Sequence, residues 1–218
     1  SMAVDAADPC VLDGIAHPID AFAAQPTVAR MAVTAQGRSW CVAMNGRIAY
    51  RTRRVGEIAP CVEGLLLQVA LLRYAGHVRL HAGAVCSGGR IHVVAGPSGA
   101  GKSTLCVALA NAGASLLTDE LVLLGPGGTV VPWSRTARLR DPPPPQMPVP
   151  LYDLPRGAAL ATVVCLEGRG TIPQLQDISP AVLLATLWPS CIGGPGAPEP
   201  LPQMAVLATA LARVRCMR

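Results

Sequence analysis

The chain has 218 residues and a formal net charge of +5, and 51% of its residues are hydrophobic although only seven are aromatic. This length suits one domain with an appended subdomain and a core of Ala, Val and Leu. The modest charge and scarce aromatics argue against nucleic-acid binding. No apolar run reaches the roughly 18 residues of a membrane-spanning helix, and the start lacks a signal-peptide layout, so we expect a cytoplasmic protein without a membrane partner.

The eight cysteines are scattered through the chain, without a C-x-x-C pair or a Cys/His cluster at ligand spacing. Scattered cysteines of this kind indicate buried or incidental thiols in a reducing compartment. We therefore expect neither a zinc site nor a disulfide framework.

The first third of the chain is expected to hold an irregular segment, a ribbon and a helix. Residues 1–26 are rich in Ala, Asp and Pro, which favours an irregular segment. Residues 27–60 contain short apolar runs separated by Gly37 and the Asn45-Gly46 turn signal, which predicts an N-terminal antiparallel β-ribbon. Residues 62–76 have the apolar spacing of a helix, and residues 77–86 alternate like a strand that turns back into an apolar run at 91–95.

A glycine-rich loop between that apolar run and a predicted helix at 103–112 fits G-x-x-x-x-G-K-[ST] at every fixed position. Glycines let successive backbone N–H groups turn inward at a helix N-terminus, where they bind phosphate. Lys102, the only lysine of the chain, would reach the β- and γ-phosphates, and the Ser103 hydroxyl would hold Mg²⁺. The predicted nucleotide-binding residues are Gly96, Pro97, Ser98, Gly99, Ala100, Gly101, Lys102, Ser103 and Thr104.

Two adjacent carboxylates interrupt the next apolar stretch, residues 114–125. They are Asp119 and Glu120, the only adjacent acidic pair of the chain. Unpaired charges in an apolar run cost several kcal/mol each, on the order of the desolvation penalty, unless a cation compensates them. Lys102 and a bound Mg²⁺ would supply that compensation.

The order LHAGAV, GPSGAGKSTL, LLTDELVLL, within residues 62–125, resembles HPr kinase/phosphorylase and the shorter HPr-kinase-like serine kinases. The resemblance implies an α/β kinase core of the HPr kinase/PEP carboxykinase type: a mixed sheet with flanking helices, here preceded by the N-terminal ribbon. It implies His81, Lys102 and Asp119 as catalytic residues, with Asp119 as the base and His81 orienting it. Glu120 stands where the bacterial enzymes have a second Asp, so with Ser103 it is the expected metal ligand.

The resemblance also implies ATP and Mg²⁺ as cofactors and a Ser or Thr hydroxyl of a peptide or small protein as the acceptor. Shorter relatives act in peptide maturation, including that of lasso-type peptides, which makes such a peptide the preferred substrate class. The separate N-terminal domain and the C-terminal signature of full-length HPr kinases are not found in this sequence. Phosphorylase activity is therefore not expected.

The rest of the chain is expected to complete a kinase core at 61–192, followed by a linker and C-terminal helix at 193–218. Arg135, Arg138 and Arg140 follow the acidic strand and are either phosphate contacts or solvated side chains. Proline-rich residues 141–150 predict an extended connector or a groove lining. Residues 159–168 predict a strand, and residues 179–190 and 204–215 predict helices, the last of which is a candidate for docking in a homo-oligomer.

Other nucleotide-binding classes share parts of this pattern. Transporter ATPases have the same loop, but no LSGGQ-like signature follows it here. Small-molecule kinases such as guanylate kinase usually open with the loop, whereas about ninety residues precede it in this chain. A small-molecule kinase and a module that binds ATP without transferring phosphate both stay open as alternatives.

Overall fold

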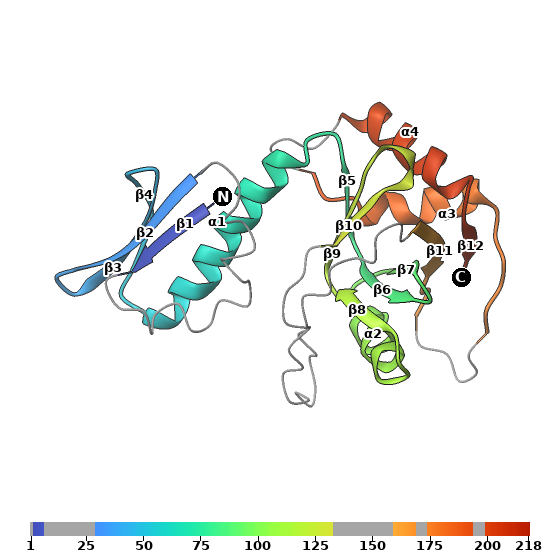
Figure 1. Ribbon diagram of the computed structural model, residues 1–218, viewed down its shortest axis with the longest axis horizontal. Helices are drawn as coiled ribbons and strands as arrows, with labels where there is room; N and C mark the ends of the chain where they lie inside the picture. The colour runs from blue at the N-terminus through green and yellow to red at the C-terminus, as the bar shows by residue number, and fades with distance from the viewer. Residues whose placement is uncertain (1, 7–28, 133–158, 169–173, 194–198) are drawn as a thin grey trace. The chain divides into compact units, whose positions relative to one another are not determined.

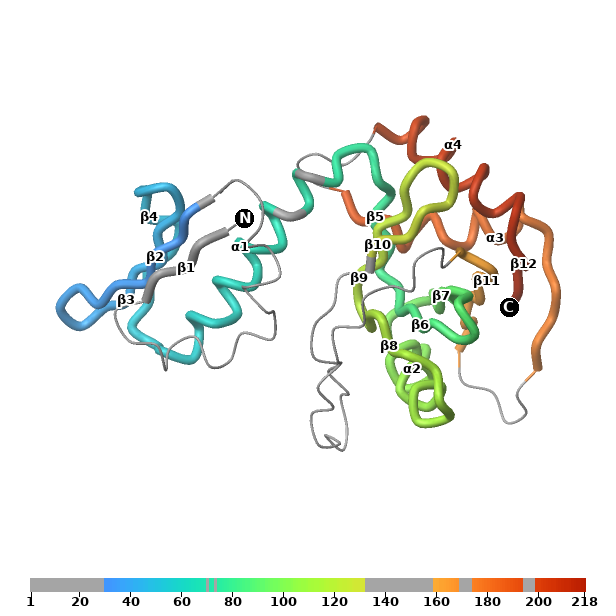
Figure 2. The backbone as a smooth tube through the Cα atoms, viewed as in Figure 1, coloured from blue at the N-terminus to red at the C-terminus, as the bar shows by residue number. Residues whose placement is uncertain are grey.

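The computed structural model describes residues 2–6, 29–132, 159–168, 174–193 and 199–218. The chain divides into two compact units, residues 1–73 and residues 74–218. Figures 1 and 2 follow the chain through both units. Within the described residues, no helix is long and apolar enough to cross a membrane.

The first unit is a four-stranded sheet with one helix packed on it. Its elements are β1 (Met2–Ala6), β2 (Ala29–Gln36), β3 (Ser39–Met44), β4 (Arg47–Thr52), the short 3-10 helix η3 (Val55–Glu57) and α1 (Ile58–Arg73). Antiparallel pairing joins β2, β3 and β4, which confirms the predicted ribbon, and Asn45 has the positive φ of 51° expected at its turn. Alternate residues Met31, Val33 and Val42 pack against α1.

One prediction for this unit was wrong. Residues 1–26 were expected to be irregular, but Met2–Ala6 form β1, which pairs in parallel with β2. The pairing partner lies more than twenty residues away in sequence, and local composition does not reveal such a distant contact. The helix also begins earlier than expected, at Ile58, and belongs by its contacts to the first unit.

Among the residues that the structure describes, the second unit contains a five-stranded mixed sheet, a three-stranded antiparallel sheet and three α-helices. In chain order its elements are β5 (Val78–His81), β6 (Gly83–Ser87), β7 (Arg90–Ala95), α2 (Lys102–Asn111), β8 (Ser115–Thr118), β9 (Leu121–Leu124), η4 (Pro126–Gly128), β10 (Val130–Pro132), β11 (Ala159–Cys165), α3 (Pro180–Leu187), η5 (Trp188–Ser190), α4 (Pro200–Leu211) and β12 (Arg215–Met217). The larger sheet has the order β12-β11-β7-β6-β8, and the smaller has the order β10-β9-β5. The mixed sheet with flanking helices was predicted, whereas β12 was predicted as the end of a helix.

Two stretches of chain each pass from the smaller sheet into the larger one, and they pair with each other along the way. Residues 78–81 pair with 121–124, and Ala84 pairs with Thr118 in the same register. The backbone N–H of Ala82 donates to the carbonyl of Glu120 at 3.2 Å, so the pairing continues between β5 and β6 on one side and β9 and β8 on the other. By this register Gly83 lies opposite Asp119, and Ala82 lies opposite Glu120.

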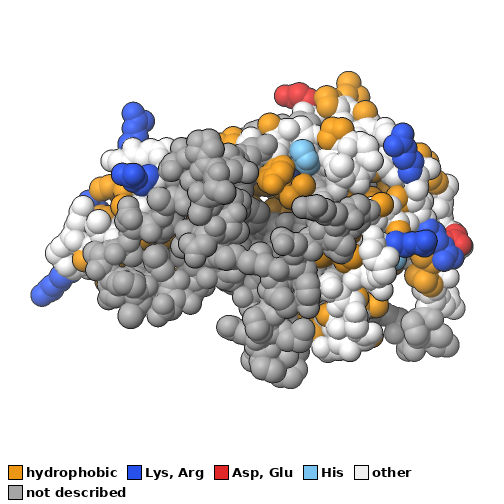
Figure 3. Space-filling model, viewed as in Figure 1, with side chains coloured by type: hydrophobic (Ala, Val, Ile, Leu, Met, Phe, Trp, Pro, Cys, Tyr) orange, Lys and Arg blue, Asp and Glu red, His pale blue; other side chains and the backbone are white. Residues whose placement is uncertain are grey.

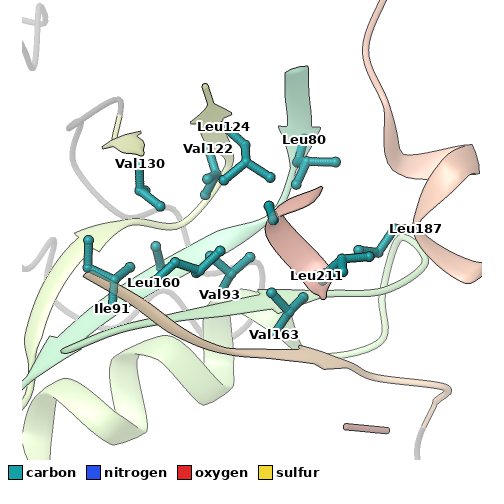
Figure 4. Close-up of a cluster of buried hydrophobic side chains, with 14 of the residues drawn as sticks. Leu80, Ile91, Val93, Val122, Leu124, Val130, Leu160, Val163, Leu187 and Leu211 are labelled. Carbon is teal, nitrogen blue, oxygen red and sulfur yellow. The ribbon is translucent and has the colours of Figure 1, made fainter. Parts of the chain in front are cut away.

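Helices cover the two faces of the five-stranded sheet. On one face, α2 packs through Cys106 against Val85, Val94 and Leu116. The opposite face forms the main core with α3, α4 and the smaller sheet. Figure 4 shows Leu80, Val122, Leu124 and Val130 of the small sheet near Ile91, Val93, Leu160 and Val163 of the larger one, with Leu187 and Leu211 from the helices. The glycine-rich loop and α2 are therefore anchored on a sheet that is buried on both sides.

Candidate functional site

The predicted site residues gather near the carboxyl ends of parallel strands in the five-stranded sheet. Strands β7, β8, β11 and β12 run in the same direction, because β6 is antiparallel to both β7 and β8 while β11 is parallel to both β7 and β12. The glycine-rich loop follows β7, and Asp119 follows β8, so both leave the sheet at the carboxyl ends of these strands. In open α/β sheets this edge is where ligands bind.

The loop has the backbone conformation that its glycines allow. Gly96, Gly99 and Gly101 have φ angles of 139°, 83° and 98°, which side chains other than glycine rarely adopt. At Gly96 an added Cβ would also collide with the backbone oxygen of Leu166, because β11 ends beside the loop. Pro97, Ser98 and Gly99 are exposed. The loop is thus an open turn at the N-terminus of α2, where amide groups of the first helical turn point toward a bound anion.

Lys102 lies within this loop and has little exposure to solvent. Its side chain is 6% exposed, and its Nζ donates hydrogen bonds to the carbonyls of Gly96 at 2.9 Å and Pro97 at 3.0 Å. Both acceptors belong to the loop itself. The single ammonium group of the chain is therefore held among the backbone groups that would surround a phosphate.

Asp119 emerges on the face of the sheet that α2 covers. Residues directly opposite in an antiparallel pair share a face, and Asp119 lies opposite Gly83. A Cβ added at Gly83 would lie 2.5 Å from Cys106 Sγ of α2 and 3.7 Å from Asp119 Cα. Gly83, Asp119 and Cys106 therefore meet at one point, and Cys106 follows Lys102 by one helical turn.

The electrostatics of nearby thiols agree with this placement. Burial and, second to it, the negative charge of Asp119 raise the pKa of Cys106 to about 12. Burial and the charge of Glu167 raise the pKa of Cys165 at the end of β11, whereas the positive charge of Lys102 lowers it. Asp119 is 4% exposed. The charges of Asp119 and Lys102 are thus each close enough to a buried thiol to shift its pKa.

His81 and Arg79 lie on the same face of the strand pair as Asp119. Strand alternation places residues 79, 81 and 83 together, and His81 lies opposite Leu121, one diagonal position from Asp119. Diagonal neighbours of this kind are within reach of long side chains. Arg79, which sequence reasoning did not select, is 1% exposed, and burial lowers its pKa. The sequence signal that could have identified Arg79 is its position two residues before His81, which places both residues on one face of the strand.

Glu120 occupies the next position and alternates to the opposite face from Asp119. Its side chain is half-buried. Ser103 lies in the first turn of α2, beside the loop, with intermediate exposure. Groups of three or more His, Cys, Asp or Glu side chains able to hold a metal do not occur among the described residues. Magnesium sites beside nucleotides commonly use one or two protein ligands together with phosphate oxygens, so Ser103 and Glu120 stay predictions as metal ligands.

Arg135, Arg138 and Arg140 lie outside the described residues, as does the proline-rich segment 141–150. Sequence reasoning also missed the close contacts that position the site, at Gly83, Cys106 and Leu166. Only the three-dimensional pairing brings these residues together.

Comparison of the sequence with family models and with curated proteins identified no relative. No family model matches the chain, and neither does any curated protein. The functional argument therefore depends on the residues themselves.

Proposed function

We propose that the chain is an ATP-dependent kinase of the HPr-kinase-like type, which transfers a phosphoryl group to a Ser or Thr hydroxyl of a peptide or small protein. The observation that carries this proposal is the position of Asp119. It lies opposite Gly83 on the face covered by α2, beside Cys106, which follows Lys102 by one helical turn, and at the end of the sheet where the glycine-rich loop begins.

The residues of the loop fit a nucleotide triphosphate. Three glycines at positive φ keep the backbone free of side chains where phosphate would approach, and Lys102 already holds its ammonium beside the loop carbonyls. Magnesium ATP, when bound, supplies the phosphoryl group and the cation that neutralises its oxygens. We assign Ser103, on the α2 side of the sheet, to that cation, and Glu120, which alternates to the opposite face, stays a predicted second ligand.

The chain's own groups would then perform positioning and proton transfer. Loop N–H groups and Lys102 bind and orient the phosphate oxygens, which is the larger part of catalysis in phosphoryl transfer. Asp119 accepts the proton of the acceptor hydroxyl at its carboxylate. His81, diagonal to it on the same face, fixes the orientation of that carboxylate.

The proposal is tested with γ-labelled ATP, Mg²⁺ and three acceptor conditions: serine-containing peptides, nucleosides and no acceptor. We expect label on serine. Asp119→Asn, which keeps shape but removes the base, should reduce transfer by about 10²–10⁴-fold while ATP affinity is retained. Lys102→Met should weaken nucleotide binding itself. Asp177→Asn is the matched control, because Asp177 is an exposed carboxylate of the same unit, paired with Arg215 at 2.7 Å.

The other outcomes assign the chain to a different class. Label on a nucleoside would identify a small-molecule kinase. ATP binding without transfer to any acceptor would leave a nucleotide-binding module. Near-normal transfer by Asp119→Asn would refute the assignment of the base.

A further inference from the structure

Strand β4 of the first unit is the outer strand of its sheet. The order β1-β2-β3-β4 leaves one side of β4 without a neighbouring strand among the described residues. Five of its six residues are exposed, including residues on each face of the strand, and only Thr52 is buried. Helix α1 packs on β2 and β3 through Met31, Val33 and Val42, and the residues of β4 are not part of that buried cluster. The backbone groups on the outer side of β4 are thus placed for pairing with another strand.

Each face of β4 combines an arginine with an apolar side chain. Arg47 pairs with Met44, and Tyr50 pairs with Val42, so both share the face of α1. Ile48 and Arg51 pair with Ala43 and Cys41 on the other face. Ile48 is 52% exposed and Tyr50 38%. A strand laid alongside would meet one positive charge and one apolar surface on either face.

The surrounding charge favours an acidic occupant. Residues 47–54 contain four arginines and no acidic residue, although the first unit as a whole, with seven arginines against four aspartates and two glutamates, has a formal net charge of only +1. Arg54 and Glu57 form an ion pair, and Tyr50 and Thr52 also donate hydrogen bonds to Glu57, so this carboxylate is already engaged. In Figure 3 the described surface of the first unit shows blue arginine side chains and, on the face drawn, no red acidic ones.

We propose that β4 binds an extended acidic peptide segment as an added antiparallel or parallel strand, with acidic side chains at Arg47 and Arg51 and apolar ones at Ile48 and Tyr50. Main-chain hydrogen bonds give affinity in this mode of recognition, and alternate side chains give specificity. The proposal concerns the first unit and does not depend on phosphoryl transfer by the second.

A competing explanation is edge protection. Proteins place charges and bulges on outer strands to prevent pairing, and the register between β3 and β4 shifts so that Ala49 is an extra residue. That explanation predicts no binding. The two are separated by direct binding measurements on the full chain.

The probe is a fluorescein-labelled peptide of alternating Glu and Val, eight residues long, followed by fluorescence anisotropy. A Lys/Val peptide tests charge, and a peptide of equal charge with proline at alternate positions tests strand pairing, because proline cannot donate to the ladder. We expect the Glu/Val peptide to bind at least tenfold more tightly than either, with affinity falling as salt is added.

Paired variants locate the binding surface. Arg47→Glu with Arg51→Glu should weaken binding at least tenfold, whereas Arg38→Glu with Arg90→Glu makes the same change of charge at residues that do not belong to β4 and should not. Hydrogen exchange of the wild-type chain should slow at residues 47–52 when the peptide is present. Equal binding of the proline peptide, equal loss in the control pair, no binding, or binding without protection at 47–52 would each overturn the proposal.

Discussion

Replacing Gly83 by Ala tests the contact that places Asp119 beside α2. An ideal Cβ at this position would lie 2.5 Å from Cys106 Sγ and 3.4 Å from the Thr118 carbonyl oxygen. Ordinary contacts between non-bonded heavy atoms are about 3.5–4.0 Å, so the methyl group overlaps the sulfur by roughly 1 Å. Either α2 or the strand pair must move.

The expected loss of stability follows from two opposing effects. Overpacking in a closed core costs about 1–3 kcal/mol. Alanine in place of glycine recovers about 0.4–1 kcal/mol through the unfolded chain, because the backbone at Gly83 does not have a positive φ. The overlap dominates, and we expect Gly83→Ala to lower the free energy of unfolding by about 1–2 kcal/mol.

A double-mutant cycle with Cys106→Ala isolates the contact. Removing the sulfur leaves room for the new methyl group, so the double variant should be more stable than the sum of the single changes predicts, by about 1 kcal/mol or more. Urea unfolding measures each free energy. Gly193→Ala, where nothing lies within 4 Å of the added Cβ, is the control and should be close to neutral. Additive effects of the two changes would show that Gly83 and Cys106 are not in contact.

Three further changes have defined outcomes. The pKa of Cys106 rises from 9.0 to about 12 on folding, so stability should fall between these pH values as the unfolded chain releases the proton, and Cys106→Ala should flatten that fall in urea titrations at pH 8 and 10. Hydrogen bonds from Thr52 and then Tyr50 lower the pKa of Glu57, so its stabilisation is present above about pH 4.5 and lost as the pH decreases, and Glu57→Gln should make acid unfolding less steep. Ser179→Ala removes the Oγ that accepts from the Val182 N–H at the start of α3 and should cost about 1 kcal/mol by thermal melting, whereas Ser179→Asn should not.

The segment from β7 through α2 was predictable because its signals are local. A glycine pattern at fixed spacing specifies the loop, and an apolar run before it and a helical pattern after it specify the flanking elements. The observed strand Arg90–Ala95 begins one residue before the predicted 91–95, and the observed helix Lys102–Asn111 is shifted by one residue at both ends from the predicted 103–112. Ser179 as the cap of α3 was likewise predictable from its own sequence.

The face occupied by Asp119 could not be predicted, because it depends on a bulge. Leu116 faces α2, and simple alternation from there would place Thr118 on that face and Asp119 in the core. The partner of β6 instead shifts between Ala84 and Val85, so that Leu117 is an extra residue; Leu117 stays on the core side, and Thr118 and Asp119 exchange the faces that simple alternation would give them. Sequence identifies the carboxylate, but only the register directs it toward α2.

Strand β12 was missed for a different physical reason. Residues 204–215 have apolar spacing that suits a helix, yet α4 ends at Leu211, and Arg215–Met217 pair with β11. Three residues are too few for a periodic signal. The pairing is also nonlocal, with about fifty residues between the two strands.

Lys102 is the only side-chain amine of the chain, and it is held at the loop by two carbonyl oxygens. An acyl-phosphate nucleotide, which acylates lysines beside bound phosphates, would therefore have a single side chain to label. The extent of labelling in the intact protein would report directly on occupancy of the loop. Competition by different nucleotides would then rank their affinities without knowledge of the acceptor.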